Sequence, residues 1–344
     1  MNPARFRVVA QVVERDGAPK TGTSGGKKES SIMNGMRDWV RTGRVVWIGL
    51  SLLGGGLWIC PAVCRGQPAT GAVRVPEGVE LFEDVVYGRG GEVELRIDIA
   101  KPTAAAAAPR PCVLVIHGGA WRGGNKRSHV DLILDFAKRG YVSATVQYRL
   151  CPQNPFPAQV EDVKCAVRFL RAHADQHAID PKRVGAVGFS AGAHLAMMLG
   201  VMAAEDGFEG SGGWADQPSR VQAVVSFAGP TDLGADDLPE VSVPLVSDFL
   251  GGSKAEKADA YRQSSPVTYA SAGDAPMLLF QGTRDPLVPY TQAFRMAERL
   301  TEAGVEGRVE LLIGAGHGWA GDEQKRSMDA MFRFLDARLN RTGP

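Results

Sequence analysis

The sequence contains a serine, an aspartate and a histidine in an arrangement that could carry out acyl transfer. Ser190 lies in the run GFSAG, Asp285 in GTRDP and His317 in GAGHG. A serine hydroxyl is a weak nucleophile by itself, so a histidine must accept its proton while a carboxylate orients the imidazole and stabilises the imidazolium. We therefore take Ser190 as the candidate nucleophile, His317 as the candidate general base and Asp285 as the candidate acid.

Ser190 has the glycine spacing of a sharp strand-to-helix turn. Gly188 precedes it and Gly192 follows it by two residues, between the apolar run VGAV and the helical stretch AGAHLAMML. A serine in such a turn has strained backbone angles, and the flanking glycines keep neighbouring side chains from colliding. In a chain with 42 glycines this motif alone could be chance. Its weight comes from Asp285 and His317, which follow later strands in the order that a nucleophile elbow requires.

A second glycine-rich run, HGGAW, begins at His117 and directly follows an expected strand. The backbone N–H groups of Gly118 and Gly119 can point at a carbonyl oxygen without obstruction by side chains, and the N–H of Ala191 would join them. These three residues are the candidate oxyanion hole. His117 itself is expected to be a hydrogen-bonding residue of the loop and not a catalyst.

Two assignments remain open in the sequence. Asp232, in the run GPTDL, is a rival for the acid, although Asp285 is favoured because it follows the seventh expected strand. Trp121, Phe189 and Trp319 are candidates for lining a substrate pocket, while packing in the core is a competing interpretation for Trp121.

The remaining histidines and cysteines do not indicate a metal site or a cofactor. His173 and His177 are four residues apart, but no glutamate accompanies the first, so we interpret them as a solvated helix end. His194 is expected to be packed and not catalytic. Cys151 and Cys165 could pair in an oxidising compartment, although their spacing does not establish the geometry that a disulfide needs. No cofactor is implied, because the serine, histidine, aspartate and backbone donors supply nucleophile, base and electrophile.

The elements that must position these residues alternate short apolar runs with amphipathic stretches from about residue 80 onward. This pattern predicts an α/β fold, with an eight-stranded, mostly parallel sheet covered by helices on both faces. The expected strands are Asp84–Tyr87, Glu94–Ala100, Cys112–His117, Val142–Gln147, Arg183–Gly188, Ala223–Phe227, Met277–Gln281 and Val309–Ile313. The expected helices are Ser128–Lys138, Ala158–Ala174, Ala191–Ala203, Tyr290–Ala303 and Glu323–Leu339.

The N-terminal part is set apart from this body. Residues 1–32 are polar and are expected to be a non-structural extension. Residues 33–69 contain the apolar run VVWIGLSLLGGGLWI between arginines and a small-residue stretch, which is typical of a secretory signal peptide; a retained membrane anchor is the alternative. Residues 70–344 are expected to form one domain, in which 229–268 is a small excursion or lid. The protein is thus expected to be secreted or periplasmic, without a stable membrane span after processing.

The charge balance excludes one class of partner. The net charge is +1, with 22% charged and 44% hydrophobic residues. This composition is that of a globular chain, and it offers no basic surplus for binding nucleic acid.

Together, HGGAW, GFSAG, the aspartate after the seventh strand and GAGHG resemble the serine esterases of the α/β-hydrolase fold. They are similar to the hormone-sensitive-lipase-like and bacterial feruloyl- or acetyl-esterase-like branch, over about residues 80–340. The segment YRL…FPA…D also matches that branch, in which Asp162 is expected to pair with Arg149. Where the family often has a third glycine in the oxyanion loop, this chain has Ala120.

This resemblance implies a serine carboxylic-ester hydrolase that acts through an acyl-enzyme. Its substrates would be small acyl or aryl esters, with acetyl or feruloyl esters of plant polysaccharide as candidates. An amide or peptide hydrolase of the same fold, formamidase-like or prolyl-peptidase-like, is an alternative; the expected secretion signal argues against a formamidase, whose substrate is intracellular. A catalytically silent binding module of this fold is a further alternative, but such modules normally lose one of the three catalytic residues.

Overall fold

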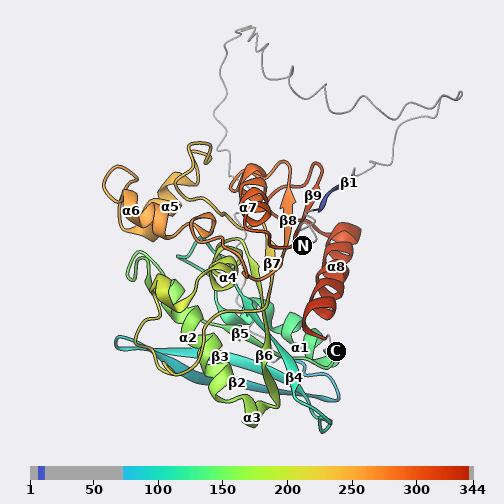
Figure 1. Ribbon diagram of the computed structural model, residues 1–344. Coiled ribbons are helices and arrows are strands. Elements are labelled where there is room, and N and C mark those ends of the chain that lie inside the picture. Colours follow the sequence, from blue (N-terminus) through green and yellow to red (C-terminus); the bar gives the residue numbers. More distant parts are fainter. Residues whose placement is uncertain (1–6, 12–72, 341–344) are drawn as a thin grey trace, which may run out of the picture. The chain divides into compact units, whose positions relative to one another are not determined.

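The structure, a computed structural model, describes residues 7–11 and 73–340, which build one mixed sheet with helices on both faces (Figure 1). Nine strands pair in the order β1-β9-β8-β7-β6-β4-β5-β3-β2. The seven strands from β1 to β5 in this order are parallel to one another. The strand β3 pairs antiparallel with both β5 and β2. The expected α/β architecture with a mostly parallel sheet is therefore confirmed.

All eight expected strands are present in the sheet. They are β2 (Val79–Gly90), β3 (Val93–Pro102), β4 (Arg110–Ile116), β5 (Val142–Val146), β6 (Ile179–Phe189), β7 (Ala223–Phe227), β8 (Met277–Gly282) and β9 (Gly307–Leu312). The largest differences in length are at β2 and β6, whose outer residues are partly exposed and polar. The apolar pattern marks only the buried part of such a strand.

A ninth strand, β1 (Arg7–Gln11), corrects the expectation that residues 1–32 contribute nothing to the fold. It pairs in parallel with β9, from Arg7 opposite Arg308 to Gln11 opposite Leu312. The run FRVVAQVV around β1 is apolar and rich in β-branched valine, but the overall composition of residues 1–32 is polar and conceals this local signal.

The helices divide between the two faces of the sheet. They are α1 (Val130–Lys138), α2 (Ala158–Ala172), α3 (Ala174–His177), α4 (Ala191–Val201), α5 (Val243–Leu250), α6 (Ala258–Gln263), α7 (Thr291–Glu302) and α8 (Gly321–Leu339). In β4, Leu114 belongs to a core cluster with α2, α4 and α7, while Val113 and Val115 belong to a second cluster with α1 and α8. The central strands are apolar at nearly every position because both of their faces are buried.

The expected excursion at 229–268 contains two short helices, α5 and α6, followed by the 3₁₀ turn η3 (Pro266–Thr268) (Figure 1). It is fastened to the loop after β8 by a hydrogen bond of 2.7 Å from Ser242 Oγ to the carbonyl oxygen of Leu287. The expected signal segment lies outside the described residues. Among the helices that are described, none is long and apolar enough to cross a membrane.

Candidate active site

Ser190 lies at the turn between β6 and α4. Close backbone packing leaves room only for glycine two residues before it and two residues after it. The φ of 53° and ψ of −119° at Ser190 are strained for a residue with a side chain. A Cβ added to Gly188 would lie 2.1 Å from the carbonyl oxygen of Gly192, and one added to Gly192 would lie 2.1 Å from that of Ile116. The strand–turn–helix context expected for this motif is therefore present.

His317 and Asp285 reach Ser190 from the loops that follow β9 and β8. Nε2 of His317 lies 2.8 Å from Oγ of Ser190, and Nδ1 lies 2.7 Å from Oδ2 of Asp285. An ionised carboxylate can only accept hydrogen bonds, so Nδ1 carries a proton and Nε2 is free to accept the serine proton. The structure thus brings together the three residues that the sequence predicted to converge.

The carboxylate of Asp285 is held by hydrogen bonds on both oxygens. Oδ1 accepts from the backbone N–H groups of Leu287 (2.8 Å) and Val288 (2.9 Å), and Oδ2 accepts from Nε2 of Gln281 (3.0 Å). Its side chain is fully buried, so these donors replace the water that an exposed carboxylate would have. Gln281 belongs to none of the sequence motifs, and the signal for it is a polar residue inside the otherwise apolar strand MLLFQG.

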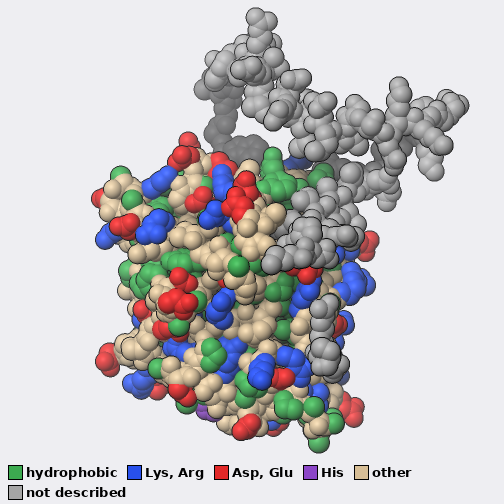
Figure 2. Space-filling model, viewed as in Figure 1, with side chains coloured by type: hydrophobic (Ala, Val, Ile, Leu, Met, Phe, Trp, Pro, Cys, Tyr) green, Lys and Arg blue, Asp and Glu red, His purple; other side chains and the backbone are tan. Residues whose placement is uncertain are grey.

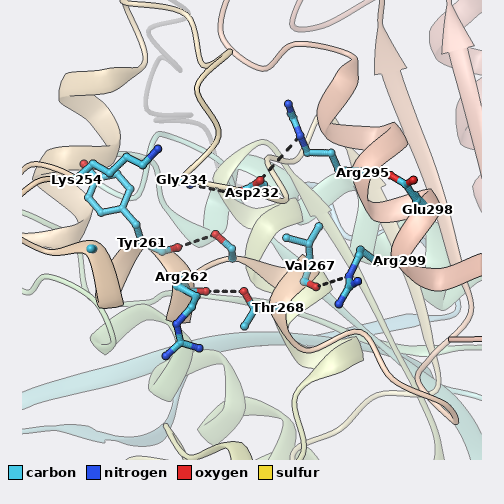
Figure 3. A pocket seen from close by; sticks show the side chains of 12 residues that line it. Asp232, Gly234, Lys254, Tyr261, Arg262, Val267, Thr268, Arg295, Glu298 and Arg299 are labelled. Carbon is cyan, nitrogen blue, oxygen red and sulfur yellow. Dashed lines mark hydrogen bonds and ion pairs between the residues drawn. The ribbon is translucent and has the colours of Figure 1, made fainter. Parts of the chain in front are cut away.

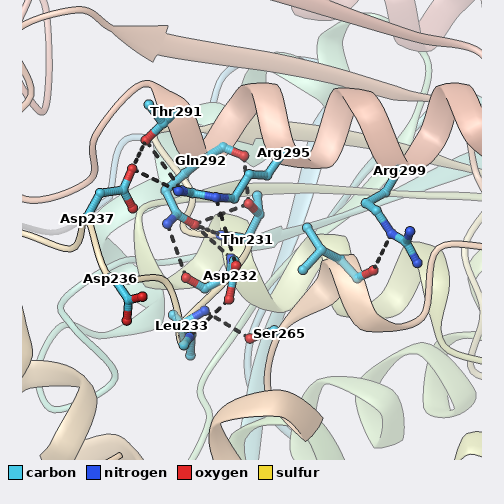
Figure 4. Close-up of polar contacts among 12 residues, drawn as sticks. Thr231, Asp232, Leu233, Asp236, Asp237, Ser265, Thr291, Gln292, Arg295 and Arg299 are labelled. Atoms are coloured by element: carbon cyan, nitrogen blue, oxygen red, sulfur yellow. Dashed lines mark hydrogen bonds and ion pairs between the residues drawn. The ribbon is translucent and has the colours of Figure 1, made fainter. Parts of the chain in front are cut away.

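Asp232, the rival acid, contacts neither Ser190 nor His317 and belongs to a different network (Figure 4). Its Oδ1 accepts from the backbone N–H of Gly234 at 3.1 Å, and its Oδ2 lies 3.9 Å from Nε of Arg295. Its backbone N–H donates to Oε1 of Gln292 at 2.7 Å. Asp232 therefore fixes the turn after β7 to α7.

Asp232 also lines a surface pocket of about 470 Å³ between the excursion and α7 (Figure 3). None of the three converging residues lines this pocket. Its cations already have acidic partners: Lys254 Nζ lies 2.7 Å from Asp236 Oδ1, and Arg295 Nη2 lies 2.9 Å from Asp237 Oδ2. On the face shown in Figure 2, basic and acidic side chains are likewise interspersed.

The HGGAW loop follows β4 and runs against the nucleophile turn. A Cβ on Gly118 would lie 2.7 Å from the carbonyl oxygen of Phe189 and 3.2 Å from Cβ of Ser190, so only glycine allows this approach. Gly119 has a φ of 120° and would bring a Cβ within 2.2 Å of the carbonyl oxygen of Gly123. Ala191 is the first residue of α4, and its N–H therefore has no partner inside the helix.

The three aromatic candidates for a substrate pocket have different surroundings. Trp121 is 3% exposed and stacks on Phe249 of α5 with ring centroids 4.3 Å apart, which agrees with the packing interpretation. Phe189 stacks on Phe227 at 4.8 Å. Trp319 is half-buried, and its Nε1 donates to the hydroxyl of a serine on α8 at 2.9 Å.

His117 lies beside the site as a buried structural residue. Its Nδ1 is 2.7 Å from the carbonyl oxygen of Gly118, and its ring stacks on Tyr148. Burial lowers the pKa of His117 to about 4, so the imidazole is neutral at physiological pH. The expected pair next to this loop is confirmed: Arg149 Nη2 lies 2.7 Å from Oδ1 of Asp162.

The side chains of His177, Cys151 and Cys165 are buried. His177 is not part of a solvated helix end, because α3 packs against β6 and the His177 ring is buried against Phe82 of β2. Cys151 and Cys165 are both free and buried, so the structure does not pair them. Within residues 7–11 and 73–340, no group of three or more His, Cys, Asp or Glu side chains could hold a metal ion.

Comparison with known proteins finds similarity to several esterases. The BD-FAE family model matches residues 97–300. The probable carboxylic ester hydrolase LipM of Mycobacterium tuberculosis is 29% identical over 255 residues, which cover 72% of this chain and 58% of LipM. The chain spans less than two thirds of the length of this and the next two curated relatives, esterases LipQ and LipC of the same organism.

Two solved structures have the same fold over most of their length. A truncated carbohydrate esterase from gut microbiota has a TM-score of 0.65 at 25% identity, covering 75% of this chain and 97% of that one. Esterase 2 of Thermogutta terrifontis, phosphonylated by sarin, has a TM-score of 0.66 at 26% identity, covering 77% and 96%. The α/β-hydrolase fold and the resemblance to its serine esterases are thereby confirmed.

Proposed function

The chain belongs to the BD-FAE family, and we propose that it is a serine carboxylic-ester hydrolase acting through an acyl-enzyme on Ser190. One observation carries the proposal: hydrogen bonds of 2.8 and 2.7 Å join Ser190 to His317 and His317 to Asp285. This is the arrangement in which a histidine can accept a serine proton and later return it to a leaving group.

In the proposed reaction, Nε2 of His317 takes the hydroxyl proton as Oγ of Ser190 bonds to the ester carbonyl carbon. The carbonyl π electrons move onto oxygen, where the N–H groups of Gly118, Gly119 and Ala191 would stabilise the charge. The intermediate collapses, the C–O bond to the alcohol breaks, and the imidazolium protonates the departing oxygen. Water then repeats the same steps on the acyl-enzyme and releases the acid.

We propose that exposed apolar side chains near the loop that carries Asp285 contact an apolar acyl or aryl group of the substrate. Val241, Val243 and Tyr290 are among the most exposed large hydrophobic residues of the described chain, at 57%, 49% and 42%. The bond from Ser242 to Leu287 brings the first two next to the loop that carries Asp285. We therefore propose small acyl or aryl esters as substrates. Because one structural neighbour is a carbohydrate esterase, acetyl or feruloyl esters of polysaccharide are included.

We also propose that the protein is exported, with the apolar run within 33–69 as its signal. Mass spectrometry of protein recovered outside the host cytoplasm should find a new N-terminus near residues 61–70. An intact N-terminus would favour a membrane anchor instead.

The proposed activity is tested with a panel of p-nitrophenyl esters, from acetate to decanoate, and with methyl ferulate. Turnover by the purified protein and its loss in Ser190→Ala would establish the esterase, and the chain-length profile would size the acyl site. A folded protein that hydrolyses none of these esters, or that hydrolyses them equally well as Ser190→Ala, would refute the proposal.

A further inference from the structure

His194 joins three segments of the chain, although it does not touch the reacting atoms. It lies one turn after Ser190 on α4 and is completely buried. Nε1 of Trp121 donates to its Nδ1 at 3.2 Å, and its Nε2 lies 2.6 Å from the carbonyl oxygen of Ser264. We propose that His194 is a positioning residue that holds the HGGAW loop in the geometry needed to stabilise the oxyanion. This inference rests on the proposed function.

The contacts of His194 fix which of its nitrogens carries the proton. An indole N–H can only donate, so Nδ1 must accept, and the proton sits on Nε2. Nε2–H then donates to the carbonyl of Ser264, and both ring nitrogens are satisfied. Because burial lowers the pKa of His194 to about 4, this neutral form persists from neutral to mildly acidic pH.

The loop that His194 holds has a backbone that needs external support. Ala120 and Trp121 are consecutive non-glycine residues with positive φ angles of 52° and 57°, and they directly follow Gly119 at 120°. Residues with a side chain persist in this region only where surrounding contacts over-determine them. For Trp121 those contacts are the hydrogen bond to His194, the stack on Phe249 and a 2.9 Å bond from the Cys151 N–H to its carbonyl.

The position of His194 explains why this support bears on rate as well as on stability. The proposed oxyanion donors come from two separate places, with Gly118 and Gly119 on the loop after β4 and Ala191 at the start of α4. His194 belongs to the same helix as Ala191 and bonds to the same loop as the glycines. One side chain thus fixes the two halves of the donor set relative to each other, and a shift of about 1 Å in such a set can cost about 100-fold in rate.

The same imidazole also fastens the excursion to this loop. Ser264 follows α6, and Phe249 lies at the end of α5. Trp121 therefore contacts the excursion directly through Phe249 and indirectly through His194. Displacement of either short helix would be transmitted to the backbone between Gly119 and Trp121.

The test removes the hydrogen bond from each side in the full-length protein. His194→Phe removes the acceptor, and Trp121→Phe removes the donor while keeping an aromatic ring against Phe249. With p-nitrophenyl acetate, each variant should lose about 10- to 100-fold in kcat with KM nearly unchanged, because the lost interaction acts in the transition state. The double variant should be no slower than the slower single one, because both changes break one contact.

Two further variants separate positioning from stability. His194→Asn keeps an amide oxygen near the position of Nδ1 and should recover much of the lost kcat. His177→Phe is the matched control, because His177 is also a buried histidine but packs on Phe82, away from Ser190. It should lower Tm without lowering kcat when the assay is run well below Tm.

A transition-state analogue supplies an independent readout. A trifluoromethyl ketone adds the Ser190 oxygen to its carbonyl carbon and leaves an oxyanion in the proposed hole, while His317 holds the proton. Its inhibition constant should rise in His194→Phe by the same factor as kcat/KM falls. Unchanged kcat and inhibitor affinity in both His194→Phe and Trp121→Phe, or equal losses in the His177 control, would overturn the inference. A wild-type protein without Ser190-dependent turnover would instead overturn the proposed function.

Discussion

Replacing Asp285 with asparagine tests the proposed catalytic geometry, because it changes which nitrogen of His317 carries the proton. All four groups that hydrogen-bond to the Asp285 carboxylate are donors: the N–H groups of Leu287 and Val288 on Oδ1, and Gln281 Nε2 with His317 Nδ1 on Oδ2. Asparagine has one oxygen and one NH₂ group. If its oxygen stays with the two backbone donors, its NH₂ replaces the acceptor opposite His317. Nδ1 must then accept, the proton moves to Nε2, and His317 can no longer take the proton of Ser190.

The size of the effect follows from this change of tautomer. A triad histidine held in the wrong tautomer loses about 10⁴-fold in kcat, which corresponds to about 5.4 kcal/mol of transition-state stabilisation. The NH₂ group of the asparagine also faces the buried Nε2 of Gln281, so two donors meet and one N–H of Gln281 loses its acceptor. A buried donor without an acceptor costs about 1–3 kcal/mol of stability. Asp285→Asn should therefore fold with a lowered Tm and be almost inactive.

Asp232→Asn is the matched control for this experiment. The Asp232 carboxylate is about one-third exposed and accepts from Gly234, a contact that an asparagine oxygen can keep. Its kcat on p-nitrophenyl acetate should stay close to that of the wild type, because Asp232 contacts neither Ser190 nor His317. Its unfolding free energy should change by about 0.5 kcal/mol or less, as is usual for surface substitutions. A loss of less than tenfold in folded Asp285→Asn would refute the tautomer argument. A larger loss in Asp232→Asn would move the acid to the loop after β7.

Three other outcomes are expected. Ser190→Ala and His317→Ala should each lower kcat by about 10⁶-fold, and the double variant should be little worse, because the residues act as a unit. A double variant whose loss in kcat is the product of the two single losses would contradict this. His117 and His194 have pKa values lowered by burial from 6.5 to about 4, so the unfolded chain binds protons first as pH falls below 6.5. As the pH falls from 6.5 to about 4, each of these two histidines should lower the unfolding free energy by about 1.4 kcal/mol per pH unit. Urea titrations in which His117→Phe shows the same pH dependence as the wild type would contradict the contribution of His117. Protein from the exporting host should begin near residues 61–70, as determined by mass spectrometry of the intact chain, whereas full-length protein would contradict cleavage.

The converging residues could be predicted from the sequence because parallel strands present their carboxyl ends at one edge of a sheet. Ser190 follows an apolar run directly, and Asp285 and His317 lie in the loops after two others, so finding the strands was enough to place the residues together. The glycines of HGGAW and GFSAG could be predicted for a related reason: each marks a place where two backbones approach too closely for a side chain.

The contacts that support these residues could not be predicted in the same way. The hydrogen bond between Trp121 and His194 joins residues 73 positions apart. Phe249, on which Trp121 stacks, lies in the excursion, whose two helices have no distinctive motif. β1 was missed because the polar composition of residues 1–32 as a whole conceals the short apolar run FRVVAQVV within it. The burial of His177 likewise depends on a contact with Phe82, which is 95 positions away in the sequence.

The two halves of the proposed machinery are supported over very different distances along the chain. Asp285 takes three of its hydrogen bonds from Gln281, Leu287 and Val288, all within four residues, so the position of the acid depends mainly on β8 and the loop that follows it. The HGGAW loop instead depends on α4 and on the excursion, through His194 and Phe249. Changes in α5 and α6 that act through Phe249 and His194 should therefore reach the reaction through oxyanion stabilisation, whereas changes at Ser242 should reach the loop that carries Asp285. The excursion thus has two separate contacts with the proposed machinery, one with the oxyanion loop and one with the loop that holds the acid.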